Sequence, residues 1–397
     1  MDNRFENRYS KRAQNVPPSF IREILKVTTS PDVISFAGGL PNSSFFPVEE
    51  FKEASVRVLE KYSSKALQYA TTEGDVQLRK YLVNYYKTQH QIDISIDEIL
   101  ITSGSQQALD LISKLFIDEG DGLMLESPSY LGAIQCFSQY KPHWIPVEIM
   151  NDGPDMEALE LMVNLHKPKL MYAIPNFQNP SGTCYSEAKR EKLAKILATN
   201  HTLLIEDDPY GALDFENSYK TPLKKLYPKG AMHLGSFSKI VAPALRLGWV
   251  VAEPEIIAKL AILKQASDLH SNYFSQLMLL EYLTHNDLLE HIQKLRKFYH
   301  SQAQVMYTGL HKYFPTTVKF DMPRGGMFFW LDFPEFVDVN KLLQNCIAEE
   351  NVVFVPGKPF YINGQNGSQK ARFNFSNGNP DKIELGLIKI ANQLNKF

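Results

Sequence analysis

The chain has 397 residues, of which 44% are hydrophobic and 22% are charged. This is an ordinary composition for a globular protein. Its 42 basic and 44 acidic residues nearly cancel and form no block of like charge, so we expect no binding to nucleic acid or to an anionic membrane. Three widely spaced cysteines without a CxxC spacing favour neither a disulfide framework nor a metal site. No apolar run resembles a secretory signal or reaches the length of a membrane span, so the sequence predicts a cytoplasmic protein.

Residues 1–47 are predicted to form an N-terminal arm that carries a short helix. The first eighteen residues are polar and charged and end in two consecutive prolines. Ser19 then suits the N-cap of a helix that extends to Lys26. A glycine-rich turn follows at residues 37–41.

Residues 48–285 alternate between helical stretches and short apolar runs, which predicts one large α/β domain. Helices are expected near residues 48–62, 75–90, 105–117, 130–139, 155–165 and 186–199. Strands are expected at the apolar runs 100–102, 123–125, 170–174, 203–205 and 249–251. Such runs between helices are typical of buried, mainly parallel strands. Polar residues gather just after these runs, and open α/β sheets bind their ligands at the carboxyl ends of strands.

Residues 286–397 show a different order of predicted helices and strands, which indicates a smaller α+β domain. A long charged helix near 285–313 opens this part of the chain, and a second helix is expected near 339–350 before a last one at the C-terminus. Strand-like segments lie at residues 317–320, 326–331, 352–355 and 371–375. Mixed strands and helices in this order are typical of an α+β domain.

Lys239 is the most informative residue of the sequence. Small and hydroxyl-bearing residues precede it in Gly235-Ser236-Phe237-Ser238-Lys239, and Arg246 follows seven residues later. This pattern suits a lysine that forms an imine with an aldehyde cofactor while serines and a cation hold a phosphate. The alternative is a surface lysine in a serine-containing loop.

Two further segments offer polar groups after predicted strands. Ser103-Gly104-Ser105-Gln106 opens a helix, where exposed backbone N–H groups make a phosphate site, although a plain N-cap turn is the alternative. Asn179 is followed by proline, serine and glycine, and its amide suits a donor to a phenolate oxygen. The alternative for this second segment is a simple β-turn.

A carboxylate and an arginine complete the candidate site. The acidic segment Glu206-Asp207-Asp208 follows a predicted strand, and a buried carboxylate there can hold a proton on a pyridine nitrogen, which improves the electron sink. Tyr210 follows closely and is within reach of a ring hydroxyl. Arg372 lies between aromatic residues of a strand and suits bidentate binding of a carboxylate. The alternatives are an acidic turn for Asp207 and a structural salt bridge for Arg372.

Together these motifs resemble the fold-type I PLP-dependent enzymes, and specifically the class I/II aminotransferases, over residues 19–376. The resemblance implies a large domain with a mainly parallel seven-stranded sheet between helices, a smaller C-terminal α+β domain and an N-terminal arm. It implies that Lys239 is the Schiff-base lysine and proton shuttle, and that Asp207 pairs with the pyridine nitrogen of pyridoxal 5'-phosphate. The remaining implied contacts are Asn179 and Tyr210 at the ring 3′-oxygen, Tyr130 stacked on the ring, Ser105, Gln106, Ser236, Ser238 and Arg246 at the phosphate, Arg372 at the substrate α-carboxylate, and Tyr69 at the phosphate of a partner subunit.

A narrower resemblance concerns the N-terminal region. Ser19-Phe20-Ile21-Arg22-Glu23-Ile24-Leu25 and the turn that contains Gly39 resemble the 2-aminoadipate and kynurenine aminotransferase II subgroup. This resemblance implies that a mobile helix brings Arg22 to the substrate side chain and that Gly39 contacts the substrate. The alternative is that Arg22 is a solvated helix residue. The same domain occurs in regulators behind a winged-helix region, and we expect no such region here because the motifs begin so early.

The resemblance implies a homodimeric aminotransferase. It would move the amino group of an L-amino acid (2-aminoadipate, glutamate, branched-chain or aromatic) to a 2-oxo acid such as 2-oxoglutarate, in ping-pong fashion through Lys239. A PLP-dependent lyase or synthase on the same fold is one alternative, because the motifs do not encode the fate of the substrate. A catalytically silent ligand-binding or regulatory protein is another, and the intact set of Lys239, Asp207 and Arg372 argues against it.

Overall fold

A computed structural model describes residues 5, 8–14, 32–364 and 366–397 of the chain. The helix expected from Ser19 to Lys26, and Arg22 with it, lies outside the described residues. Within the described part, no helix combines the length and the apolar character that crossing a bilayer requires.

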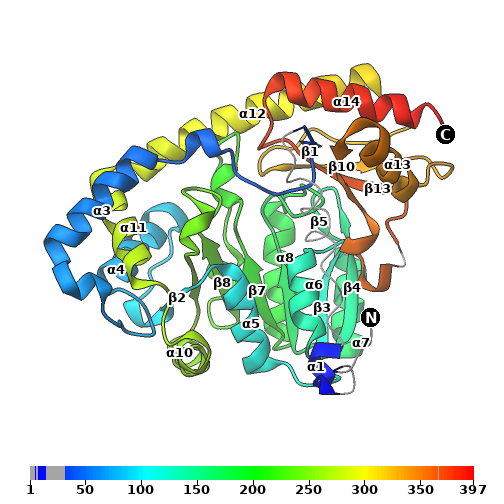
Figure 1. Ribbon diagram of the computed structural model, residues 1–397. Helices are drawn as coiled ribbons and strands as arrows, with labels where there is room; N and C mark the ends of the chain where they lie inside the picture. Colours follow the sequence, from blue (N-terminus) through cyan, green and yellow to red (C-terminus); the bar gives the residue numbers. More distant parts are fainter. Residues whose placement is uncertain (1–4, 6–7, 15–31, 365) are drawn as a thin grey trace.

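An eight-stranded sheet forms the centre of the molecule (Figure 1). Its strands, in spatial order, are β2 (Ile99–Thr102), β9 (Gly248–Val251), β8 (Ala231–Ser236), β7 (Leu203–Asp207), β6 (Leu170–Ala173), β3 (Gly122–Ser127), β4 (His143–Met150) and β5 (Gly153–Pro154). The five strands from β8 to β4 are parallel, and β9 is antiparallel to both of its neighbours. Strands β2, β8, β7, β6 and β3 therefore all end at the same edge of the sheet.

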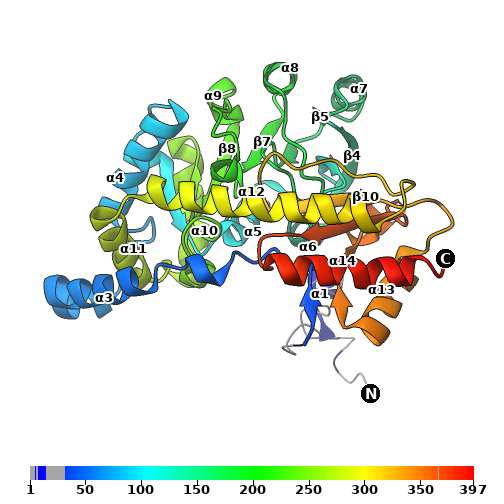
Figure 2. The same cartoon turned by 90° about the horizontal axis from the view of Figure 1, so that it is seen from above.

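Helices cover both faces of this sheet, as the view from above shows (Figure 2). The helices of the two layers and their flanks are α3 (Val48–Tyr62), α4 (Val76–Tyr85), α5 (Ser105–Phe116), α6 (Leu131–Ser138), α7 (Met156–His166), α8 (Glu187–Thr199), α9 (Leu223–Leu226), α10 (Pro254–Asp268) and α11 (Tyr273–His285). Helices α7, α8 and α9 lie on one face and α5 and α6 on the other. Every residue of β2, β6, β8 and β9 is buried, which explains why the predicted strands are apolar runs without alternation.

The sheet differs from the sequence prediction in its number of strands. Seven strands were expected, and the structure has eight, so that number is wrong. The edge strand β5 has only two residues and pairs antiparallel with the end of β4. A two-residue strand after the turn at Asn151 and Asp152 is too short to leave a periodic signal in the sequence.

The C-terminal part of the chain contains a small antiparallel sheet with helices beside it. Its elements are α12 (Leu288–Tyr313), β10 (Phe328–Asp332), α13 (Val339–Asn345), β11 (Val352–Val353), β12 (Val355–Pro356), β13 (Lys370–Asn374) and α14 (Pro380–Leu394). The order in the sheet is β10-β13-β12. Helix α12 runs along the molecule and packs beside α14, so it links the two sheets (Figures 1 and 2).

A segment from the N-terminal part of the chain packs against the small sheet. Strand β1 (Ile34–Ser35) pairs in parallel with β11. The next residue, Phe36, accepts a hydrogen bond at its carbonyl from the backbone N–H of Asn374, over 2.8 Å. This contact brings the turn that contains Gly39 close to strand β13, which carries Arg372.

Candidate active site

A cavity of about 700 Å³ lies at the edge of the large sheet where the parallel strands end, opposite strand β13. Twelve of the predicted site residues line it: Gly39, Ser105, Gln106, Tyr130, Asn179, Asp207, Tyr210, Ser236, Ser238, Lys239, Arg246 and Arg372. They come from segments far apart in the sequence, and the shared edge of the sheet brings them together. The residues after β2, β3, β6, β7 and β8 form one wall, and β13 supplies Arg372.

Lys239 lies three residues after the end of β8 and projects into the cavity. Its Nζ donates a hydrogen bond to the carbonyl oxygen of Gly39 over 2.7 Å. Burial, with smaller contributions from the positive charges of Arg372 and Arg246, lowers the pKa of Lys239 to about 8. A lysine with such a pKa is partly neutral near pH 7.5 and can act as a nucleophile or a base.

Asp207 is the last residue of β7 and is buried. Its Oδ2 accepts a hydrogen bond from the phenol of Tyr172 over 2.8 Å. Its Oδ1 is buried without a hydrogen-bond partner among the residues that the structure describes. Burial raises the pKa of Asp207 to about 7, while the hydrogen bond from Tyr172 lowers it. A buried acceptor without a donor is costly, which marks Oδ1 as a contact point for a bound group.

Asn179 and Arg372 hold each other at the far side of the cavity. Nη1 of Arg372 donates to Oδ1 of Asn179 over 2.7 Å, and Nη2 donates to the carbonyl oxygen of Ala37 over 2.5 Å. A guanidinium only donates, so the Asn179 oxygen is the acceptor and its NH2 group is left to donate elsewhere. The guanidinium carbon lies 4.2 Å from the ring centre of Phe328 and 5.2 Å from that of Phe360. These contacts fix the plane of the guanidinium.

The opposite end of the cavity is suited to an anion. Helix α5 begins at Ser105 after Gly104, which has a φ of 81° and no side chain that caps the helix. The first N–H groups of the helix therefore remain available at its positive end. Three side chains from the segment after β8 complete this corner: Ser236, Ser238 and Arg246.

Comparison with known proteins agrees with this geometry. The family model described as aminotransferase class I and II matches residues 31–390. This chain belongs to the family of class I and II aminotransferases. Aromatic-amino-acid aminotransferase 1 of Thermococcus litoralis is 39% identical over 393 residues, which cover 98% of this chain and 94% of that protein.

Solved structures of two other aminotransferases superpose closely on this one. Alpha-aminoadipate aminotransferase from Thermus thermophilus, complexed with N-(5'-phosphopyridoxyl)-L-leucine, has a TM-score of 0.92 and 37% identity, covering 99% of this chain and 98% of its own. Kynurenine aminotransferase from Pyrococcus horikoshii has a TM-score of 0.93 and 39% identity with the same coverage. The predicted family, the fold-type I architecture and the aminotransferase function are confirmed.

Among the residues that the structure describes, one predicted site residue of this aminotransferase, Tyr69, does not line the cavity. Tyr69 has 77% of its surface exposed and packs edge-on against His270, 5.8 Å between ring centres. An exposed tyrosine can reach a cofactor only in the site of a second copy of the chain, so its role stays a prediction. Arg22 lies outside the described residues.

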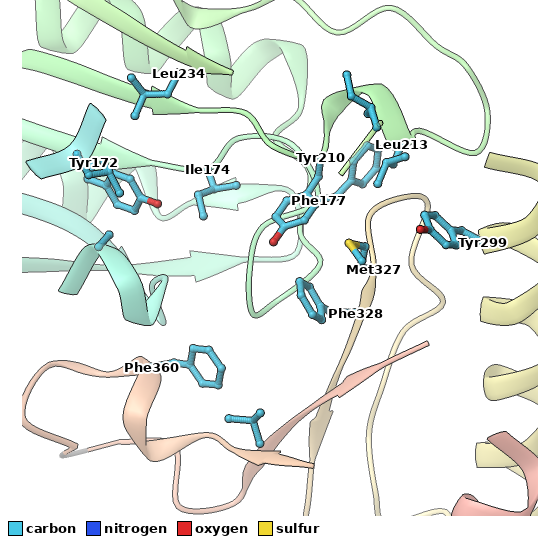
Figure 3. Packing of buried hydrophobic residues seen from close by; sticks show 14 of the residues in the cluster. Tyr172, Ile174, Phe177, Tyr210, Leu213, Leu234, Tyr299, Met327, Phe328 and Phe360 are labelled. Atoms are coloured by element: carbon cyan, nitrogen blue, oxygen red, sulfur yellow. The ribbon is translucent and has the colours of Figure 1, made fainter. Parts of the chain in front are cut away.

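Several residues at this site of the aminotransferase were missed in the sequence. Phe328 lines the cavity, and its ring meets that of Tyr210 edge-on at 5.8 Å (Figure 3). Phe360 approaches Arg372 from another direction. The hydroxyl of Tyr172 donates a hydrogen bond to Asp207 Oδ2, the carboxylate oxygen other than Oδ1. Phe328 and Tyr172 stand in apolar runs and Phe360 in a turn-rich segment, so each looks like an ordinary structural residue in the sequence, and only the spatial contact distinguishes them.

Proposed function

We propose that this aminotransferase binds pyridoxal 5'-phosphate in the cavity and transfers the amino group of an L-amino acid to a 2-oxo acid such as 2-oxoglutarate. The observation that carries the proposal is one cavity with three chemically distinct groups. These are a lysine amine of lowered pKa (Lys239), a buried carboxylate oxygen that has no partner among the described residues (Asp207 Oδ1) and a buried guanidinium (Arg372).

The cavity offers a partner for each polar group of pyridoxal phosphate. The anion corner at the start of α5, with Ser105, Gln106, Ser236, Ser238 and Arg246, suits the phosphate. Asp207 Oδ1 suits the protonated ring nitrogen, since it is an acceptor to which no described residue donates. The NH2 group of Asn179 and the hydroxyl of Tyr210 suit the ring oxygen. The amine of Lys239 suits the aldehyde.

The ring face has a candidate partner in Tyr130. A Cβ atom at Gly132 would lie 2.6 Å from the ring of Tyr130, so only glycine leaves this ring its present place on the cavity wall. An aromatic ring there can stack on a bound ring. The solved relative from Thermus thermophilus, which carries a phosphopyridoxyl group, supports the same assignment of the cofactor.

The bound cofactor supplies an electron sink for the pair that remains when the substrate Cα loses its proton. Lys239 would be freed when the amino group of the substrate takes its place on the aldehyde carbon, and its amine, with a pKa lowered to about 8, would be the base for this proton. The same amine would then deliver the proton to the carbon that carried the aldehyde. Asp207 keeps a negative charge beside the ring nitrogen, and Arg372 with Asn179 fixes the α-carboxylate, so that the Cα proton stays within reach of the amine.

The walls of the cavity support a broad choice of amino donor. The apolar residues that line it beside the polar groups include Leu131, Ile134, Ile174, Phe328 and Pro359. Such a lining suits branched-chain and aromatic side chains. The names of the relatives cover aromatic amino acids, aminoadipate and kynurenine. For dicarboxylic donors such as 2-aminoadipate and glutamate, we propose that Arg22 supplies the cation that pairs with the distal carboxylate.

We also propose that the active form is a homodimer. The exposed ring of Tyr69 then serves the phosphate in the neighbouring site, and two-fold dimers are the commonest soluble oligomers. Sedimentation velocity checks this proposal. A fully active monomer at the assay concentration would contradict it.

An amino-donor screen tests the proposed function. The protein is loaded with pyridoxal phosphate and given single L-amino acids together with 2-oxoglutarate, and glutamate is measured. We expect glutamate from leucine, phenylalanine, kynurenine or 2-aminoadipate, with one 2-oxo acid formed for each glutamate. Release of ammonia or carbon dioxide without glutamate would instead indicate a lyase on this fold.

A further inference from the structure

Tyr172 is a buried residue of strand β6 that is absent from the cavity lining but forms a hydrogen bond with Asp207, which lines the cavity. It is fully buried, and its hydroxyl donates to Asp207 Oδ2 over 2.8 Å. The hydroxyl points toward the side on which Ile174 and Tyr210 lie (Figure 3). We propose that Tyr172 is a positioning residue that holds the Asp207 carboxylate in its ionised form and aims Oδ1 at the bound ring nitrogen. The inference rests on the proposed function of Asp207.

The two oxygens of Asp207 have different environments, so one can be held in place while the other contacts the bound ring. Oδ2 is occupied by the phenol on the side of the sheet interior, and Oδ1 is left without a partner among the described residues. Strands β6 and β7 are parallel neighbours, with Tyr172 in register with Ile205, so the phenol reaches Asp207 diagonally across the ladder. A carboxylate held at one oxygen cannot rotate freely, which fixes the direction of the other.

The phenol acts on the carboxylate as a fixed hydrogen-bond donor. Burial raises the pKa of Tyr172 well above its ordinary value of 10, so the hydroxyl keeps its proton at every pH of interest. A donor favours the ionised form of its acceptor, and it opposes the burial that raises the pKa of Asp207 to about 7.

Other titratable groups also act on the Asp207 carboxylate. Asp208, the next residue, disfavours its charge, and His233 on β8 favours it. The groups whose own ionisation is coupled to Asp207 are Glu126 on β3, Tyr130, Tyr172, Tyr210 and His233. Of the two residues that favour the ionised form of Asp207, Tyr172 is the one in hydrogen-bond contact with it.

The consequence concerns the proton between Asp207 and the ring nitrogen. A weaker base at Asp207 leaves this proton on the nitrogen, where it is needed for the electron sink. Without the phenol the carboxylate becomes more basic, and the proton moves toward Asp207. Tyr172 thus sets the charge of the bound ring without touching it.

The experiment compares wild type, Tyr172→Phe and the matched control Tyr185→Phe. Tyr185 is also a buried phenol that donates to a buried carboxylate, Glu126, over 2.5 Å, but neither residue of this pair lines the cavity. Each protein is loaded with pyridoxal phosphate labelled with 15N in the ring, and the ring 15N chemical shift is followed against pH. The dissociation constant of the cofactor and the pKa of Asp207 in cofactor-free protein, from 13C-carboxyl NMR, complete the comparison.

In Tyr172→Phe we expect the ring 15N shift to move toward that of an unprotonated pyridine, the pKa of Asp207 to rise, and the cofactor to bind about tenfold more weakly. In Tyr185→Phe we expect lower thermal stability and a wild-type ring 15N shift. A wild-type ring shift in Tyr172→Phe, together with a changed shift in Asp207→Asn, would overturn the role of Tyr172 alone. A wild-type shift in Asp207→Asn as well would overturn the proposed role of Asp207. A changed shift in Tyr185→Phe equal to that in Tyr172→Phe would show that any damage to the core has this effect, and would also overturn the inference.

Discussion

Replacing Arg372 by leucine removes the proposed anchor of the substrate α-carboxylate while keeping an apolar side chain between Phe328 and Phe360. Burial lowers the pKa of Arg372 only to about 10, so the guanidinium is charged at neutral pH. A hydrogen bond to a charged group contributes about 1.5–3 kcal/mol, and a bidentate pair therefore about 3–6 kcal/mol. We expect kcat/KM for leucine to fall roughly a hundred- to ten-thousand-fold.

The assay for this prediction needs a donor without the carboxylate. For 3-methylbutylamine, which is leucine without its carboxyl group, we expect equal and slow turnover by wild type and by Arg372→Leu. Arg372→Lys keeps the charge but loses the planar fork, so its loss with leucine should be intermediate. Arg372→Leu also leaves Asn179 Oδ1 and the carbonyl of Ala37 without a donor, at about 1–3 kcal/mol each, so thermal melting is measured in parallel. Equal losses for leucine and for the amine in a folded protein would refute the assignment.

Three further changes test other parts of the site. In Gly104→Ala the new Cβ would lie 2.7 Å from Nη2 of Arg246 at a φ of 81°, a strain of about 1–3 kcal/mol, so we expect weaker binding of pyridoxal phosphate by fluorescence titration. Unchanged affinity would show that the corner at α5 does not hold the phosphate. Because burial lowers the pKa of Lys239 to about 8, the rate of bond formation with pyridoxal phosphate should rise as the pH increases through about 8 and the amine loses its proton. A midpoint near the ordinary lysine value of 10.5 would contradict this environment. Arg22→Ala should lower kcat/KM for 2-aminoadipate and glutamate by about ten- to a hundredfold and affect leucine much less, and equal losses would show that Arg22 does not recognise the side chain.

The arrangement of the large domain could be predicted because buried parallel strands leave a strong signal. The apolar runs at residues 170–173 and 203–205 lie in neighbouring parallel strands that are almost entirely buried, and the polar residues that follow them share one edge of the sheet. That is why the structure gathers residues from distant segments around one cavity. Their individual roles at the cofactor, and the two boundaries between the three predicted domains, stay predictions.

Strand β8 shows why other elements could not be predicted. Its residues include His233 and Gly235, which do not form an apolar run. His233 is acceptable there because its Nδ1 lies 2.6 Å from the hydroxyl of Tyr86, a partner far away in the sequence. Gly235 is needed because a Cβ atom would lie 2.1 Å from the indole of Trp249 on the neighbouring strand. Both explanations are long-range contacts, which a single sequence does not reveal.

Two strands predicted in the C-terminal part of the chain differ in the structure. Residues 317–320 were expected to form a strand, but only Lys319 makes an isolated bridge, to Asp332. The run 352–355 was expected to be one strand and is instead divided between β11 and β12, which pair with different partners. Short apolar segments are ambiguous because their pairing depends on the neighbours that tertiary packing supplies.

The most direct test of the central claim follows the cofactor through half of the reaction. Protein loaded with pyridoxal phosphate is mixed with leucine, phenylalanine, 2-aminoadipate and glutamate without any oxo acid, and the released cofactor is identified by mass spectrometry. The account predicts stoichiometric conversion to pyridoxamine phosphate with one equivalent of 2-oxo acid, and no conversion in Lys239→Ala over the same time. Unchanged pyridoxal phosphate in the wild-type protein, or conversion at the wild-type rate in Lys239→Ala, would contradict it.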